Sequence, residues 1–325
     1  MDTQNGALDI VIVGAGPAGL ACAISAQQNG LSYLVIDKGC LVNSIFHFPT
    51  NVTLFSTADL LEIGGVPFII TSEKPNRLEL VNYYRGVARH YNLKLHLYEQ
   101  VKEIRGRKGR FEIRTEKATY VSRNVVVATG QYGQPRRLGV PGEDLPKVSH
   151  YYTEGHPYFG RKVAVIGGKN SAVETALDLY RHGAEVTLIH RGAELGRSVK
   201  YWIRPDLENR IKEGAIRALF NTIVKEIRET DLIVQTAGSG EQTLANDFVF
   251  AMTGYTIDAP FLRRLGVEID PDGTPRHNPD TLETNVPGLY IAGVVTAGND
   301  GGKVFIENSR NHGTKITGHI LNGAN

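Results

Sequence analysis

Cysteine is scarce in this chain, whose 325 residues include only two, Cys22 and Cys40. They form no Cys-x-x-Cys pair, and they are too few for the disulfide framework of a small secreted protein. A charge imbalance is also lacking, because 36 Lys and Arg nearly match 34 Asp and Glu, for a net charge of +2. Such a balance creates no broad field that attracts nucleic acid or an anionic membrane, so we expect neither as a partner.

Long hydrophobic runs are absent as well. Apolar stretches such as residues 10–13 are interrupted by Gly and Pro, far short of the roughly 20 residues that span a bilayer. Residues 1–5 carry no basic segment ahead of an apolar core, so we expect no secretion signal and a cytoplasmic protein. No His or Cys cluster has metal-ligand spacing, so no metal is expected. With 41% hydrophobic residues, the chain is long enough to form two domains.

The first informative pattern is a strand, a glycine-rich turn and a helix. Residues 8–13 are apolar, residues 14–19 read Gly-Ala-Gly-Pro-Ala-Gly, and residues 20–28 are good helix formers. The three glycines permit the turn, the approach of a pyrophosphate and the packing of helix on strand. A second apolar strand ends at Asp37, about 20 residues beyond the motif, where a ribose-binding carboxylate is expected. The predicted dinucleotide site consists of Gly14, Gly16, Pro17, Ala18, Gly19, Asp37 and Lys38.

A second copy of the pattern begins at residue 163. An apolar strand is followed by Gly-Gly-Lys-Asn-Ser-Ala at residues 167–172 and by a helix-forming run to residue 181. The next strand, residues 185–189, ends in His190 and Arg191 instead of an acidic residue, and arginine pairs with the 2′-phosphate of NADPH that a carboxylate would repel. The predicted NADPH site consists of Gly167, Gly168, Lys169, Asn170, Ser171, His190 and Arg191. Arg197 and Lys200 either join the anion site or belong to a solvated face.

Two more strands stop at a glycine, at residues 128–130 and 288–293, and their order around the nucleotide motifs indicates a cofactor role for Thr129, Gly130 and Gly293. The second of them follows the NADPH motif, so the first domain must resume there. We predict an α/β fold with two Rossmann-like, three-layer ββα dinucleotide-binding domains. The inserted NADPH domain spans residues 134–249, between residues 1–133 and 250–325 of the first domain. The two crossings are expected near residues 133–135 and 251–254, because both stretches are rich in turn residues.

The order of these motifs resembles that of the low-molecular-weight thioredoxin reductase superfamily over essentially the whole chain. The resemblance implies FAD in the first domain, NADPH in the second, a homodimer, and hydride transfer from NADPH to the flavin. Lys303, Val304 and Phe305 precede a predicted final helix, and their backbone N–H groups are expected to stabilise negative charge on the reduced flavin. A capped surface helix is the alternative.

Local strings at residues 154–158, 167–172 and 303–308 are closer to the bacillithiol disulfide reductase (YpdA-type) subfamily. This resemblance implies reduction of a low-molecular-weight disulfide. The chain departs from both patterns, because the Cys-x-x-Cys pair of thioredoxin reductases falls at His150 and Thr153, and the subfamily's proposed nucleophilic cysteine falls at Ala18. Electrons therefore cannot reach a substrate through the usual internal disulfide.

The electron acceptor stays open at this stage. Direct reduction of a small disulfide by the flavin, reduction of a small electron carrier as in ferredoxin or flavodoxin NADP reductases, and a flavin-based redox sensor are three alternatives. Cys22, one helical turn beyond Ala18, and His156 are the catalytic candidates, and His150 and His312 are further candidate proton donors. A structural role is the more usual explanation for each of these side chains, since a cysteine in an Ala-rich helix is usually a small core residue and scattered histidines usually make structural contacts.

Overall fold

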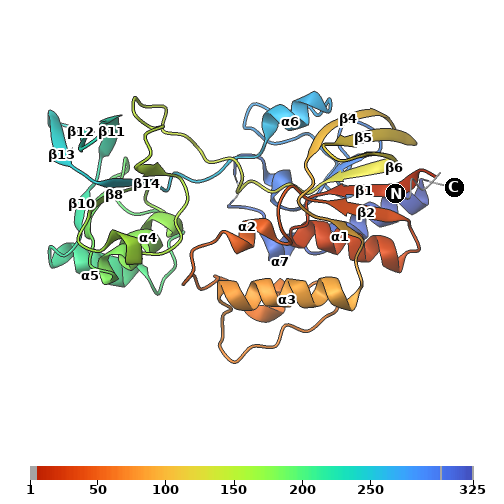
Figure 1. Cartoon of the computed structure of the whole chain (residues 1–325), viewed down its shortest axis with the longest axis horizontal. Coiled ribbons are helices and arrows are strands. Elements are labelled where there is room, and N and C mark those ends of the chain that lie inside the picture. Colours follow the sequence, from red (N-terminus) through yellow and green to blue (C-terminus); the bar gives the residue numbers. More distant parts are fainter. Residues whose placement is uncertain (1–5, 301, 324–325) are drawn as a thin grey trace. The chain divides into compact units, whose positions relative to one another are not determined.

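The computed structural model describes residues 6–300 and 302–323 (Figure 1). The chain divides into two compact units, a first unit of residues 1–47, 53–134 and 255–325 and a second unit of residues 48–52 and 135–254. Residues 1–5, on which the expectation of no secretion signal rests, lie outside the described residues. Among the described residues, no helix has the length and apolar character needed to cross a membrane.

Within the described residues, the first unit contains a seven-stranded sheet in the order β3-β2-β1-β6-β5-β4, with β15 paired to β6. Its strands are β1 (Leu8–Val13), β2 (Tyr33–Ile36), β3 (Leu95–His96), β4 (Val101–Arg107), β5 (Arg110–Thr115), β6 (Thr119–Val127) and β15 (Leu289–Ile291). The long β6 changes partner along its length, because residues 119–122 pair with antiparallel β5 and residues 125–127 pair with parallel β15. The carboxyl ends of β1, β6 and β15 therefore meet at one edge of the sheet.

Helices pack on this sheet, and α1 runs alongside β1 and β2 (Figure 1). The helices of the first unit are α1 (Pro17–Gln28), α2 (Asn43–Phe46), α3 (Arg77–His90), α6 (Ala259–Arg264), α7 (Ile306–Ser309), α8 (His312–Asn322) and the 3₁₀ turns Ala58–Leu61 and Gly293–Ala297. Residues 19–26 of α1 are buried because α8 packs on its other side. The two helices approach most closely at Gly313, where a Cβ atom would lie 2.6 Å from the carbonyl oxygen of Ala21.

The second unit contains a parallel sheet in the order β10-β9-β8-β14-β7 and an antiparallel sheet in the order β11-β12-β13. Its elements are β7 (Val148–Ser149), a 3₁₀ turn (His156–Tyr158), β8 (Lys162–Ile166), α4 (Asn170–Arg181), β9 (Glu185–Ile189), α5 (Arg204–Lys212), β10 (Arg217–Leu219), β11 (Thr222–Ile227), β12 (Asp231–Thr236), β13 (Glu241–Ala245) and β14 (Phe248–Ala251). One apolar cluster joins α4 to the parallel sheet, and another joins that sheet to the antiparallel one. These three layers, and the β8-α4-β9 copy of β1-α1-β2, confirm the predicted α/β class.

The boundaries of the second unit differ from the predicted residues 134–249. The unit continues past the predicted end at Val249 to Gly254, within the crossing expected at residues 251–254, because β14 pairs with β8 as far as Ala251 opposite Ile166. Residues 48–52 also belong to the second unit, where the Thr50 N–H donates to the Thr153 carbonyl at 2.8 Å. Nothing in the sequence pattern marked this short segment, since its partner is distant along the chain.

Replacing Gly313 by Ala is predicted to lower the free energy of unfolding by about 1–3 kcal/mol, because the new methyl group would collide with α1 backbone. Gly318 on the same helix is the matched control, since its Cβ position is open. Gly318→Ala should stabilise the protein by about 0.5–1 kcal/mol. Urea unfolding of both variants measures the difference. Equal stabilities would show that the contact between α1 and α8 has room for a methyl group at residue 313.

Candidate functional site

The first glycine motif joins β1 to α1. At two of its glycines, Gly14 and Gly19, neighbouring backbone leaves no room for a side chain. Gly14 has φ of 117°, and a Cβ atom there would lie 2.3 Å from the Ala128 carbonyl oxygen. A Cβ atom on Gly19 would lie 1.9 Å from the Gly14 carbonyl oxygen, whereas the Cβ position of Gly16 faces open space. Gly16 is also the residue that precedes α1. The motif is thus closed on the strand side and open at the helix start, which fits the pyrophosphate of a dinucleotide.

Asp37 follows β2 and is held beside this turn. Its carboxylate accepts hydrogen bonds from the Ala15 N–H and the Gly39 N–H, both at 2.7 Å. These bonds fix the carboxylate next to the glycine motif, where it is expected to face the ribose. Lys38 is exposed, and its Nζ lies 3.1 Å from the Cβ position of Gly133.

The segments after β6 and β15 complete the same edge of the sheet. Ile291 is paired with Val127, so Thr129 and Gly130 leave the sheet beside Gly293. Gly293 has φ of 74°, and a Cβ atom on it would lie 2.8 Å from the Cβ atom of Ala18. The fold therefore brings these predicted FAD contacts together with the first glycine motif.

His312 supports this edge from behind. Its Nδ1 accepts a hydrogen bond from the Gly293 N–H at 3.1 Å, and the ring is buried. Burial, with smaller contributions from Lys315 and His277, lowers the pKa of His312 to about 4. The ring is therefore neutral at pH 7, which speaks against a proton donor and indicates a support for the Gly293 turn. Sequence reasoning missed this contact because it joins residues from separate elements.

Residues 303–305 differ from the expected open helix start. The Lys303 N–H donates to the Asp300 carbonyl at 3.1 Å, and the Phe305 N–H donates to the Asn308 side chain at 2.8 Å. Only the Val304 N–H lacks a hydrogen-bond partner among the described residues. Two of the three N–H groups expected to face the flavin therefore already have partners within the loop, and the role of residues 303–305 stays a prediction.

The second glycine motif joins β8 to α4. Gly167 has φ of 148°, and a Cβ atom on it would lie 2.5 Å from the Met252 carbonyl oxygen. A Cβ atom on Gly168 would lie 2.4 Å from the ring of His190, so that ring packs directly on the turn. Lys169 and Ser171 are exposed at the start of α4. The exposed helix start again fits an anionic group of a nucleotide.

His190 is a packing residue of this site, since its ring also lies against Gly192, whose Cβ position is 2.7 Å from Nε2. Burial lowers the pKa of His190, and the neighbouring Arg191 lowers it further. Arg191 and Arg197 are exposed, and neither makes an ion pair within the described residues. Lys200, by contrast, is buried and paired with Glu174, so its charge is not available to a phosphate.

Comparison with known proteins decides the family. Residues 11–293 match the model of the pyridine nucleotide-disulphide oxidoreductases. The chain belongs to this family. It is an NADPH-dependent flavoprotein reductase whose cofactors are FAD and NADPH, and the predicted resemblance is confirmed.

Three relatives illustrate its range. Bacilliredoxin reductase Bdr of Bacillus subtilis is 46% identical over 317 residues, covering 97% of this chain and 98% of the relative. The structure of bacillithiol disulfide reductase Bdr (YpdA) from Staphylococcus aureus has a TM-score of 0.95 and 42% identity, covering 98% of this chain and 99% of that one. A ferredoxin–NADP reductase of Ignicoccus hospitalis is 26% identical, covering 89% of this chain and 90% of the relative.

The two cysteines of this reductase are poorly suited to redox chemistry. Cys22 of α1 is buried in the apolar cluster that α1 forms with the sheet and with Ile316 of α8, and burial raises the pKa of its thiol to about 12. Burial also raises the pKa of Cys40, which donates a weak bond to Asn43. A thiol that resists ionisation is a poor nucleophile. The structure therefore disfavours Cys22 as a catalytic residue.

The segment that replaces the Cys-x-x-Cys pair places one residue in the core, while Thr153, one of the pair's two positions, is exposed. Tyr152 is buried, donates to Asp178 of α4 at 2.5 Å and lies edge-on to Phe250 at 5.1 Å. His150 lies 3.2 Å from Glu143 in the same unit. His156 is exposed in the following 3₁₀ turn. The two positions of the redox pair thus hold a histidine and an exposed threonine, and the tyrosine between them packs into the core.

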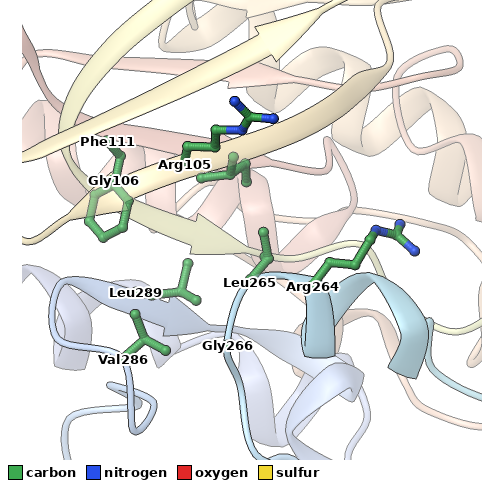
Figure 2. A pocket seen from close by; sticks show the side chains of 9 residues that line it. Arg105, Gly106, Phe111, Arg264, Leu265, Gly266, Val286 and Leu289 are labelled. Carbon is green, nitrogen blue, oxygen red and sulfur yellow. The ribbon is translucent and has the colours of Figure 1, made fainter.

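A separate cavity of about 370 Å³ lies in the first unit (Figure 2). It is lined by Ile104, Arg105, Gly106, Phe111, Arg264, Leu265, Gly266, Val286 and Leu289. The guanidinium groups of Arg105 and Arg264 point away from Phe111, and that of Arg105 pairs with Glu103 at 2.7 Å. None of the predicted cofactor residues lines the cavity, so it is distinct from the sheet edge at which β1, β6 and β15 end.

Acidification is predicted to destabilise the protein through His312. The unfolded chain takes up a proton at the ordinary pKa of 6.5, whereas the folded chain resists it until about pH 4. Stability is therefore fully present above pH 6.5 and is lost as the pH falls toward 4, by about 2 kcal/mol between pH 7 and pH 5. Urea unfolding at both pH values should show this loss in the wild type and a smaller one in His312→Gln, and equal losses would contradict it.

Proposed function

We propose that this protein reduces bacillithiol disulfide with electrons from NADPH, delivered by the flavin without a cysteine relay. Two similar proteins carry names that specify bacilliredoxin and bacillithiol disulfide. Bound flavin supplies the required chemistry, because it exchanges electron pairs with both nicotinamide and disulfides. In the balanced reaction, one NADPH and one proton convert the disulfide into two thiols and leave NADP⁺.

The placement of the thiols carries the proposal. Cys22 is buried in the apolar core beneath α1 and has a raised pKa, and the pKa of Cys40 is raised too. The protein's own part is to bind and orient: Gly16 leaves room for a pyrophosphate, Asp37 is fixed toward a ribose, and His312 holds Gly293 behind Ala18. A flavin held by these residues would supply the electron pair that cleaves the substrate disulfide.

A ferredoxin or flavodoxin acceptor is the second candidate, since one relative is a ferredoxin–NADP reductase and such transfer needs no thiol. A homodimer and a cytoplasmic location belong to the proposal as well, on the family resemblance. Light scattering of the purified holoprotein tests the dimer.

Turnover is predicted to survive removal of either thiol. The flavoprotein is reduced anaerobically with NADPH and mixed with bacillithiol disulfide while the flavin absorbance is recorded. We expect the oxidised spectrum to return, with the same rate in wild type, Cys22→Ala and Cys40→Ser. A loss above about tenfold in either variant, or about 1.4 kcal/mol in the barrier, would assign that thiol a redox role.

Other acceptors supply the alternatives in the same assay. Recovery with ferredoxin or flavodoxin but not with bacillithiol disulfide would favour the second candidate. Recovery with oxidised bacilliredoxin alone would replace the small disulfide by a protein one. Reduction by NADPH without recovery by any of them would favour a redox sensor.

A further inference from the structure

The loop of residues 192–200 carries Arg197 beside the second glycine motif and is fastened to that motif. The Gly196 N–H donates to the Gly168 carbonyl at 2.8 Å. Leu195 and Val199 are buried in the apolar cluster that α4 forms with the parallel sheet. Arg197 therefore projects from a loop whose flanking residues are anchored on both sides.

Asn170, the first residue of α4, adds a polar clamp. Its side-chain Nδ2 donates to the Ser198 carbonyl at 3.0 Å, and its Oδ1 accepts from the Lys200 N–H at 2.8 Å. One amide thus binds the loop on both sides of Val199. The glycine motif and the loop form one structural unit.

The ion pair between Glu174 and Lys200 lies about one turn further along α4. The Lys200 side chain is only 7% exposed and that of Glu174 is 23% exposed. The ammonium group also lies 5.7 Å from the ring centroid of Trp202. Lifting the loop would separate two poorly solvated charges, which is strongly unfavourable.

The cations near this site therefore divide into two kinds. Lys200 is neutralised within the protein, while Arg191 and Arg197 are exposed and lack ion-pair partners in the described ranges. A guanidinium group binds a phosphate in a fixed, often bidentate geometry, so its contribution depends on where the loop holds it.

We propose that the Glu174–Lys200 pair sets the coenzyme preference, by holding the 192–200 loop so that Arg197 joins Arg191 at the 2′-phosphate of NADPH. The inference rests on the proposed assignment of the second glycine motif and Arg191 to NADPH. Lys200 and Glu174 are positioning residues, since neither is available to the coenzyme. Releasing the loop weakens binding of NADPH and leaves NADH, which has no 2′-phosphate, largely unaffected.

The test is steady-state oxidation of NADPH and of NADH by the holoprotein, with an artificial electron acceptor in excess that reoxidises the flavin. In Glu174→Gln and Lys200→Met we expect the KM for NADPH to rise about tenfold, the KM for NADH to change little and kcat to be retained. Lys200→Arg should keep the preference, because the ion pair is preserved. Arg181→Met is the matched control, since the exposed Arg181–Asp206 pair also involves α4 but does not touch the loop.

A lone buried charge can prevent folding, so the double variant Glu174→Leu with Lys200→Met carries the same test with both charges replaced by apolar groups. A wild-type preference in this double variant, or equal KM rises for both coenzymes, would overturn the inference. Arg197→Ala and Arg191→Ala test separately whether the 2′-phosphate binds at this site at all. If these arginine variants lower the preference for NADPH over NADH while the Glu174 and Lys200 variants do not, the inference about the ion pair is wrong but the phosphate site stands. If the arginine variants have no effect either, the assignment of this site to the 2′-phosphate is wrong as well.

Discussion

Contact between backbone and backbone at the glycine turns is the constraint on which both nucleotide sites depend. Gly14 lies against Ala128, Gly19 against Gly14, and Gly167 against Met252, each too close for a side chain. These contacts bring the start of α1 and the start of α4 to the carboxyl ends of the parallel strands in their sheets. Once the helix starts are placed there, Asp37 in one unit and Arg191 in the other follow from the next strand.

Local patterns explain how much of this fold and site could be predicted from the sequence. The apolar runs and glycine spacing predicted β1 and β9 with their observed bounds, because such signals lie within a few neighbouring residues. The end of β14 was missed, since its register against β8 depends on a partner distant along the chain. The Gly293–His312 bond and the Glu174–Lys200 pair were missed for the same reason, as each joins residues from separate segments.

The missing thiols change where disulfide chemistry can occur. In this chain the positions of the Cys-x-x-Cys pair hold His150 and an exposed Thr153, on either side of the buried Tyr152, and the position proposed for a nucleophilic cysteine is Ala18, packed against Gly293. The remaining thiol on α1, Cys22, is buried and resists ionisation. The electron path that is left runs from NADPH to the flavin and from the flavin directly to the acceptor.

Anaerobic titration of the holoprotein with NADPH measures this electron path most directly, because it counts the electron pairs that the protein stores. We expect one equivalent of NADPH per bound FAD to bleach the flavin fully, with no further uptake, in the wild type and in a Cys22→Ala, Cys40→Ser variant alike. Uptake of a second equivalent by the wild type that disappears in the variant would contradict a path without thiols.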